Sequence, residues 1–208
     1  MKALAVLGGP VNLWPQLTKY DLMMGADRGA LFLKEKGIIA DLAIGDFDSL
    51  SKQEFKDLTN QVPDVRIYNP VKDLTDSEEL IKAAFIDYGV DYLTIIGWSG
   101  ARFDHTQVNF HLPCRFPEYA EKISLLDKNN LIHYYLPGKH QVKLEAGFKY
   151  FGISCLTKVK QLELAGSKYE LAATDIEKAM TFSSNEFVGD SFSLSFSEGR
   201  VAVIYSHD

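Results

Sequence analysis

Two aspartates separated by a single residue follow a short apolar run early in the chain. They are Asp46 and Asp48, in the stretch AIGDFDSL at residues 43–50. The run ends where a strand would leave a sheet, and two carboxylates this close together repel each other. Folding alone gives no reason for such a pair. We therefore expect a cation between the two carboxylates.

Three further acidic motifs share this position just after an apolar run. They are Asp27 in GADRGA, Asp73 and Asp76 in KDLTDSEE, and Asp104 in GARFDHTQVN. The carboxyl ends of parallel strands lie at one edge of an open sheet, so these side chains should converge there. Converging carboxylates without His or Cys partners are hard oxygen ligands, which favour Mg²⁺. The motifs therefore predict a Mg²⁺ site at this edge.

Most of these acids also have a purely structural interpretation. Thr75 with Glu78 fits a helix capping box, and Asp104 with Gln107 fits a similar cap. Asp27 fits a turn or the start of a helix. The pair in GDFDS does not fit this interpretation, because capping uses one acid and the second adds repulsion.

Mg²⁺ bound to carboxylates usually accompanies a polyphosphate substrate, which also needs a positive clamp. Arg102 is a candidate, because a guanidinium binds phosphate oxygens as a planar fork. The small residues of GWSGARFDH (97–105) and GGP (8–10) would let backbone N–H groups approach phosphates. His105 could contact phosphate or be a packed residue near a helix start. The patterns GxxxxGK[ST] and GxGxxG are absent, which excludes a P-loop enzyme and a dinucleotide-binding Rossmann protein.

The elements that would position these residues alternate along the first two thirds of the chain. Apolar runs predict strands at 2–8, 21–27, 41–46, 65–69 and 91–98. Helical spacing predicts helices at 29–36, 51–59, 76–88 and 104–112. This alternation is typical of an α/β fold with an open parallel sheet flanked by helices.

After about residue 120 the pattern changes to short strand-like runs separated by turn residues. These runs lie at 122–127, 130–136, 140–145, 149–156 and 160–166. Residues 191–206 predict a hairpin that turns at Glu198-Gly199, with Phe192, Leu194 and Phe196 on one face. We expect a C-terminal antiparallel β-sandwich domain at 136–208, a catalytic α/β domain at 1–135, and a hinge at LPGKH.

Composition excludes several classes of function. The 208 residues carry a net charge of −6 and no basic cluster, so we expect no nucleic-acid partner. The two cysteines, Cys114 and Cys155, have no metal-binding spacing, which argues against structural zinc and favours a reducing cytoplasm. No apolar run approaches the roughly 20 residues of a membrane helix. We therefore expect a cytoplasmic protein without a membrane partner.

Taken in order, ADRGA, IGDFDS, KDLTDSEE and GxxGxRxDHxxxN (97–109) resemble the motifs of the thiamine pyrophosphokinase family. The segment TFSSNEF (181–187) resembles the part of that family that contacts thiamine. Two positions depart from the pattern, since Arg28 and Ala101 stand where the family often has Gly. The resemblance implies a homodimer with active sites between subunits. It also implies transfer of the pyrophosphoryl group of ATP to the hydroxyl of thiamine, with release of AMP and thiamine diphosphate.

The resemblance also implies roles for individual residues. Mg²⁺ would be held by Asp46, Asp48 and an acid from Asp73 and Asp76, and these acids with Arg102 and Asp104 would form the catalytic set. The ATP frame would comprise Asp27, Arg28, Arg102, Asp104, His105 and Asn109, and the thiamine contacts would be Ser183, Ser184 and Asn185. The polar SSNE segment between Phe182 and Phe187 suits stacking and hydrogen bonding to a heteroaromatic ring. One aspartate could accept the hydroxyl proton, but the sequence does not single one out.

Two other functions compete with this interpretation. GDFDS resembles the DxD motif of Mg²⁺-dependent phosphohydrolases, although in that class the motif usually follows the first strand. A nucleotide- or thiamine-binding module without catalysis is the second alternative. Such a module would gain nothing from carboxylates around phosphate in the absence of a metal.

Overall fold

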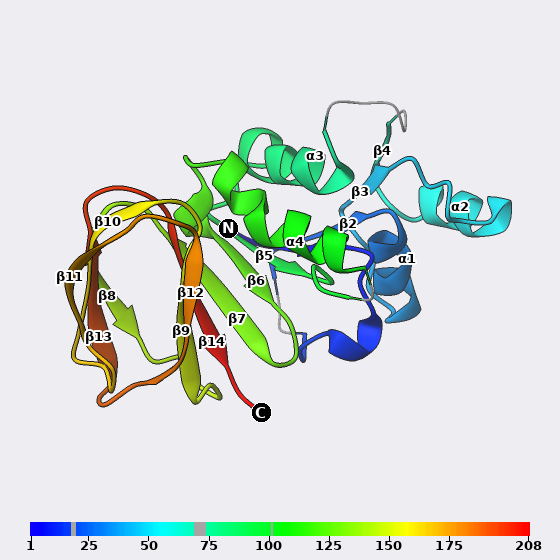
Figure 1. Ribbon diagram of the computed structural model, residues 1–208. Helices are drawn as coiled ribbons and strands as arrows, with labels where there is room; N and C mark the ends of the chain where they lie inside the picture. Colours follow the sequence, from blue (N-terminus) through cyan, green and yellow to red (C-terminus); the bar gives the residue numbers. More distant parts are fainter. Residues whose placement is uncertain (18–19, 69–73, 101) are drawn as a thin grey trace. The chain divides into compact units, whose positions relative to one another are not determined.

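The structure is a computed structural model that describes every residue except 18–19, 69–73 and 101. It contains two compact units (Figure 1). Unit 1 comprises Met1–Leu112 and Leu125–Lys128, and unit 2 comprises Pro113–Ser124 and Asn129–Asp208. Strand β6 (Ile123–Leu126) contains one of the boundaries. Strand β7 (Asn130–Tyr135), which the expected division at 135/136 assigns to the first domain, belongs to unit 2.

Unit 1 is an α/β unit with a parallel sheet in the order β5-β1-β2-β3-β4. Its strands are β1 (Lys2–Val6), β2 (Leu22–Ala26), β3 (Leu42–Gly45), β4 (Asp64–Ile67) and β5 (Tyr92–Ile96). Its helices are α1 (Arg28–Glu35), α2 (Lys52–Thr59), α3 (Asp76–Lys82), continued by the π-helical η2 (Ala83–Asp87), and α4 (Phe103–His111). The short 3₁₀ helices of the chain are η1 (Val11–Leu13), η3 (Leu112–Arg115) and η4 (Ala120–Lys122). Strands β1 to β5 and helices α1 to α4, with α3 and η2 taken together, were predicted with ends within two residues, whereas the 3₁₀ helices were not predicted.

Strand β1 lies inside the sheet because it pairs with both β2 and β5. Its residues Leu4 and Val6 are fully buried and share a core cluster with Leu33 of α1 and Leu58 of α2. Burial on both faces explains why β1, β2 and β3 are apolar without alternation, whereas the edge strand β4 is only partly buried. No described helix is both long and apolar enough to cross a bilayer.

Local capping starts α3 at the expected position. The Thr75 hydroxyl accepts from the Glu78 N–H at 3.3 Å, and the Glu78 carboxylate accepts from the Thr75 N–H at 2.7 Å. The predicted capping box is therefore confirmed. The alternative interpretation of Asp104 as a helix cap is wrong, because the N-cap of α4 is Arg102 and Asp104 lies inside the first turn.

Unit 2 is an antiparallel sandwich of two sheets, in the orders β12-β9-β14-β7 and β11-β10-β13-β8. Phe151, Phe192 and Tyr205 are among the fully buried side chains of its core. The strands besides β7 are β8 (Gly138–Lys143), β9 (Tyr150–Cys155), β10 (Val159–Ala165), β11 (Leu171–Ile176), β12 (Met180–Glu186), β13 (Ser191–Phe196) and β14 (Val201–Ser206).

The hairpin predicted at 191–206 is wrong, although both of its strands exist. Strand β13 pairs with β8 and β10, whereas β14 pairs with β7 and β9. The connection through Glu198-Gly199 therefore joins the two sheets of the sandwich. The expected apolar face of β13 is confirmed, because Phe192, Leu194 and Phe196 are all buried.

Candidate functional site

At the carboxyl edge of the unit 1 sheet, Asp46 and Asp76 both lie close enough to Asp27 for their charges to act on it. Asp27 follows β2, Asp46 follows β3, and Asp76 begins α3. Burial, followed by the negative charge of Asp76, raises the pKa of Asp27 to about 7. Asp73, which was predicted to join this cluster, lies outside the described residues. The structure therefore brings Asp27 close to Asp46 and to Asp76.

The geometry of GDFDS explains why two aspartates flank a phenylalanine. Phe47 adopts a left-handed φ of 55° and is 4% exposed, and the centre of its ring lies 5.4 Å from that of Phe55. The buried ring anchors the turn, and the less buried carboxylates of Asp46 and Asp48 lie on either side of it. The Asp48 N–H donates to the Asp46 carboxylate at 3.1 Å. The turn thus holds two acids near the sheet edge.

Asp27 shapes the same turn. Its carboxylate accepts from the Phe47 N–H at 3.3 Å. A Cβ at Gly45 would lie 1.8 Å from the nearer oxygen of Asp27, so only glycine lets this carboxylate cross the end of β3. The φ of Asp27 is 46°, an unusual conformation for a residue other than glycine. Strain of this kind is concentrated at functional sites.

The donor chemistry of the acidic cluster fits a hard divalent cation. In the described part of the chain, no three His, Cys, Asp or Glu side chains are grouped closely enough to hold a metal ion. Mg²⁺ does not need such a cage, because it keeps several waters and binds through one or two carboxylates plus substrate phosphates. The mutual repulsion around Asp27 is the kind of arrangement that a cation would relieve.

A pocket of about 340 Å³ lies in unit 1 next to this cluster. Strands β2 to β4 lie on one side of β1 and β5 lies on the other, so the strand order reverses between β1 and β5. Residues 7–10 follow β1, residues 97–100 follow β5, and both segments line the pocket. Ligands of open α/β sheets bind at such a switch point. Ala26 and Ser77, the chain neighbours of Asp27 and Asp76, also line it.

The two loops of the pocket touch through their backbones. The Gly9 N–H donates to the Gly97 carbonyl oxygen at 2.9 Å. A Cβ at Gly9 would lie 2.4 Å from the carbonyl oxygens of both Gly97 and Ser99, so the approach requires glycine. The Ser99 hydroxyl donates to the buried carboxylate of Asp127 at 3.1 Å. The expectation that GGP contributes to the site therefore fits the lining of the pocket.

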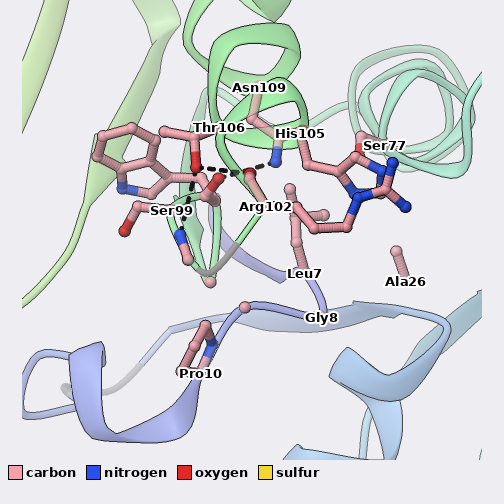
Figure 2. A pocket seen from close by; sticks show the side chains of 14 residues that line it. Leu7, Gly8, Pro10, Ala26, Ser77, Ser99, Arg102, His105, Thr106 and Asn109 are labelled. Atoms are coloured by element: carbon pink, nitrogen blue, oxygen red, sulfur yellow. Dashed lines mark hydrogen bonds between the residues drawn. The ribbon is translucent and has the colours of Figure 1, made fainter.

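Helix α4 fixes the loop at 97–100 from the other side (Figure 2). The Asn109 amide donates to the Trp98 carbonyl at 2.8 Å, and the Thr106 hydroxyl accepts from the Gly100 N–H at 3.3 Å. Asn109 and Thr106 therefore hold the loop in place. The pocket lies beside the loop, and Arg102 also lines it. Asn109, expected in the ATP frame, thus lies at the pocket and orders its backbone.

Arg102 brings a guanidinium to this pocket, together with the ring of His105. Its Nη2 lies 2.6 Å and its Nε 3.3 Å from the Asp104 carboxylate, and these bonds lower the pKa of Asp104. The two side chains are 68% and 65% exposed, and exposed ion pairs contribute little to stability. Arg102 can therefore exchange this carboxylate for a phosphate at small cost.

Three residues expected in the ATP frame do not line this pocket in the part of the chain that the structure describes. They are Asp27, Arg28 and Asp104. Arg28 instead donates to the Ser49 carbonyl at 3.3 Å and lies 5.6 Å over the ring of Phe32. It thereby supports the segment that follows the paired aspartates.

Two residues that line the pocket, Thr106 and Ser77, were not predicted from the sequence. A signal for Thr106 was present, because Arg102, His105, Thr106 and Asn109 are spaced i, i+3, i+4 and i+7, which is one face of a helix. For Ser77 the only signal was its place next to Asp76.

Unit 2 carries a second pocket, of about 570 Å³, over the β12-β9-β14-β7 sheet. Ser183 and Ser184 line it, as the resemblance implied for a thiamine contact. Its lining is rich in hydroxyl groups, with two carboxylates and a glycine: Asn130, Tyr150, Gly152, Tyr169, Thr181, Ser183, Ser184, Glu186, Ile204, Ser206 and Asp208.

A β-bulge explains why two consecutive serines line this pocket. The pairing of β12 with β9 shifts between Phe182 and Asn185, and Ser184 adopts a φ of 60°. A bulge adds one residue to a strand and changes which face the following side chains occupy. Ser183 and Ser184 are therefore both exposed, whereas Asn185 is turned inward and only 7% exposed.

Two residues that follow the bulge, Asn185 and Phe187, do not line the 570 Å³ pocket. Asn185 does not line the 570 Å³ pocket but a neighbouring pocket of about 260 Å³. Of the two aromatic residues that flank SSNE, Phe187 is partly buried, and its ring packs against the core at 4.8 Å from Phe151 and 5.3 Å from Phe192. Tyr169 is an aromatic residue that does line the larger pocket.

The two units match two models of one protein family. The model described as thiamin pyrophosphokinase, catalytic domain, matches residues 13–126. The model described as thiamin pyrophosphokinase, vitamin B1 binding domain, matches residues 139–201.

Individual relatives agree with these matches. The thiamine pyrophosphokinase of Bacillus subtilis (strain 168) is 33% identical and aligns with 98% of this chain and 97% of its own. The crystal structure of a thiamin pyrophosphokinase family protein from Enterococcus faecalis is 37% identical, covers 100% of both chains and has a TM-score of 0.96. The structure of yeast thiamin pyrophosphokinase, at 16% identity and a TM-score of 0.78, is similar in fold. The matched family models and the extent of identity show that this chain belongs to the thiamine pyrophosphokinase family.

Proposed function

We propose that this chain is a Mg²⁺-dependent thiamine diphosphokinase, which transfers the pyrophosphoryl group of ATP to the hydroxyl of thiamine. One observation carries the proposal. The acidic cluster of Asp27, Asp46 and Asp76 adjoins a pocket at the switch point of the sheet that also contains Arg102. Carboxylates beside a guanidinium are what a magnesium polyphosphate complex requires.

Mg²⁺ would be held by Asp46, Asp48 and Asp76, with Asp73 completing the proposed set. Asp73 lies outside the described residues. When bound there, the ion would neutralise charge on the polyphosphate.

Arg102 binds the polyphosphate of ATP after releasing Asp104, using the planar fork that now holds the carboxylate. His105 and the backbone N–H groups of the two glycine-containing loops lie at the same pocket and supply further donors. The loops are held by backbone contacts and by α4, so these donors are positioned before ATP arrives. Catalysis by such a site consists of positioning and electrostatic stabilisation.

Thiamine binds in the 570 Å³ pocket of unit 2, with its polar groups facing Ser183 and Ser184. In the transfer, the oxygen of the thiamine hydroxyl bonds to the β-phosphorus of ATP. The bond from that phosphorus to the bridging oxygen of AMP breaks, and the hydroxyl proton is released.

The reacting atoms of the two substrates must come within about 3–3.5 Å. We include a homodimer in the proposal, because the family resemblance implies active sites between subunits. Light scattering should give a dimer, and a fully active monomer would refute this part.

We also place the protein in the cytoplasm, in keeping with its two free cysteines, Cys114 and Cys155.

Incubation with ATP, Mg²⁺ and thiamine tests the proposal directly. A thiamine diphosphokinase releases AMP in an amount equal to the thiamine diphosphate formed. A phosphohydrolase of the DxD type would release inorganic phosphate without requiring thiamine. A binding module would release neither product.

A further inference from the structure

Strand β6 is followed by two residues, Asp127 and Lys128, that contact the segments around the unit 1 pocket from outside the pocket. The Asp127 carboxylate accepts from the Ser99 hydroxyl at 3.1 Å. The Lys128 N–H donates to the Leu13 carbonyl at 2.8 Å, in the 3₁₀ helix that directly follows the other pocket loop. Both residues belong to unit 1, and neither lines the pocket in the part of the chain that the structure describes. They are therefore placed to brace the pocket without touching a ligand in it.

The carboxylate of Asp127 is buried, which is unfavourable unless hydrogen bonds offset the loss of hydration. The residue is 8% exposed, and the Ser99 hydroxyl is one of its donors. A hydrogen bond from a hydroxyl to a carboxylate is stronger than one between two neutral groups. A carboxylate that faced the pocket would repel a polyphosphate, whereas Asp127, outside the lining, can hold the loop and stay away from the nucleotide.

The bond to Asp127 completes the anchoring of the loop at 97–100. Three other bonds hold the backbone of its remaining residues, and they come from Gly9, Asn109 and Thr106. Ser99 itself lies at the closest approach of the two pocket loops, because a Cβ built on Gly9 would lie 2.4 Å from the Ser99 carbonyl oxygen. A shift of Ser99 would therefore change the shape of both loops.

Ser99 also lies apart from the guanidinium that the proposed function assigns to the phosphates. Figure 2 shows Ser99 at the left of the pocket, whereas the side chain of Arg102 extends to the right. A change at Ser99 should therefore alter how well the pocket holds ATP and leave the proposed clamp in place.

We propose that Asp127 is a positioning residue for ATP, which through the Ser99 hydroxyl holds the loop at 97–100 in the arrangement that binds the nucleotide. The proposal rests on the proposed function and deepens it, because it adds a residue that supports the ATP pocket without contacting ATP.

The first experiment measures the binding of ATP with Mg²⁺, in the absence of thiamine, by titration calorimetry on variants of the full chain. Asp127→Ala should weaken binding at least fivefold. Asp127→Asn should stay within twofold of wild type, because its amide oxygen can still accept from Ser99. Equal losses in these two variants would overturn the proposal, because the hydrogen bond would then not be what matters.

Ser195→Ala is the matched control for the loss of such a bond. The Ser195 hydroxyl donates to the Glu163 carboxylate at 3.3 Å in unit 2, and neither residue lines any of the three pockets described above. Its affinity for ATP should equal that of wild type. If Asp127→Ala binds ATP as tightly as Ser195→Ala, Asp127 does not position the loop.

A double-mutant cycle tests whether Asp127 acts through Ser99. Ser99→Ala should weaken ATP binding by about the same factor as Asp127→Ala. The double variant should lie within twofold of either single variant, because both changes remove the same bond. Losses that multiply in the double variant would show that Asp127 acts on the pocket by another route and would overturn the assignment.

Kinetics separate positioning from a general loss of structure. Asp127→Ala should raise the KM for ATP at least fivefold and leave kcat and the KM for thiamine within twofold of wild type. Equal rises in both KM values, together with a fall in Tm, would show a structural role and overturn the proposal. If Asp127→Ala does not fold, Ser99→Ala, which removes only a hydroxyl, decides in its place.

The failure of the proposed function would be seen separately. That function fails if wild type forms no AMP with ATP, Mg²⁺ and thiamine. The role of Asp127 fails if calorimetry shows no difference between the Asp127→Ala and Ser195→Ala variants, whatever the AMP assay shows.

Discussion

Replacing Gly9 by alanine should disrupt the pocket of unit 1 from its backbone. The added Cβ would lie 2.4 Å from the carbonyl oxygens of Gly97 and Ser99, about 1 Å inside ordinary van der Waals contact. Both neighbours are backbone atoms, and a Cβ at Gly97 would in turn lie 2.4 Å from the Leu7 carbonyl oxygen. The two loops must therefore move apart as whole segments.

Overpacking of this kind destabilises a protein by about 1–3 kcal/mol, and rigid backbone neighbours place Gly9→Ala at about 2–3 kcal/mol. For a chain of this size that corresponds to a fall in Tm of roughly 4–12 °C. Gly8→Ala is a matched control for stability, because nothing lies within 4 Å of its added Cβ. Its Tm should stay unchanged or rise slightly, since alanine restricts the unfolded chain.

Thermal unfolding in EDTA without nucleotide measures the stability of both variants, and ATP with Mg²⁺ is then added. Wild type should gain about 2.7 kcal/mol at an ATP concentration of one hundred times Kd, and Gly9→Ala should lose most of this gain. Equal Tm values for Gly8→Ala and Gly9→Ala would refute the close packing of the loops. A destabilised Gly9→Ala that keeps its affinity for ATP would show that ATP binds elsewhere.

Three further variants test individual side chains. Arg102→Lys should keep its Tm but release AMP at least tenfold more slowly, because lysine loses the planar fork; unchanged turnover would place the clamp elsewhere. Asp48→Asn should be as stable as wild type in EDTA and lose most AMP formation in Mg²⁺, whereas an unstable but active variant would make the pair structural. Asp27, with its pKa raised to about 7, is protonated in the fold at low pH and its ionisation opposes folding as pH rises. In urea unfolding with EDTA, the free energy of unfolding of Asp27→Asn should therefore rise relative to that of wild type between pH 4 and pH 7. The expected rise is about 1–2 kcal/mol, because solvent screening reduces the full linkage value. A difference that is independent of pH would contradict the crowding around Asp27.

The sequence predicted unit 1 well because its inner strands β1, β2 and β3 are buried on both faces. A continuous apolar run such as that of β1 depends little on which strand lies beside it. The convergence of Asp27, Asp46 and Asp76 could be predicted for the same reason, since parallel strands end at one edge. The role of Asp104 was predicted less well, because in the structure its carboxylate pairs with Arg102, two residues away along the chain. Chain proximity alone does not decide whether an acid caps a helix or pairs with a neighbouring cation.

Unit 2 was harder to predict because local patterns do not specify which sheet a strand joins. The alternating residues Phe192, Leu194 and Phe196 face the core in a hairpin and equally in a connection between sheets. A turn at Glu198-Gly199 is compatible with both arrangements. Strands β11 and β12 were not predicted, because most of their side chains are exposed or only partly buried and no apolar alternation remains.

The bulge at Ser184 explains why the roles within SSNE could not be separated from the sequence. In a regular strand Ser183 and Asn185 share a face and Ser184 occupies the other. The register shift in the pairing with β9 exposes both serines and turns Asn185 inward, where it meets the backbone of Tyr169. Whether a strand bulges depends on its partner strand, which residues 181–187 do not encode by themselves. Ser183 and Ser184 therefore line the pocket, whereas Asn185 holds the backbone of Tyr169. Tyr169, which lies in none of the predicted motifs, lines the same pocket as the two serines.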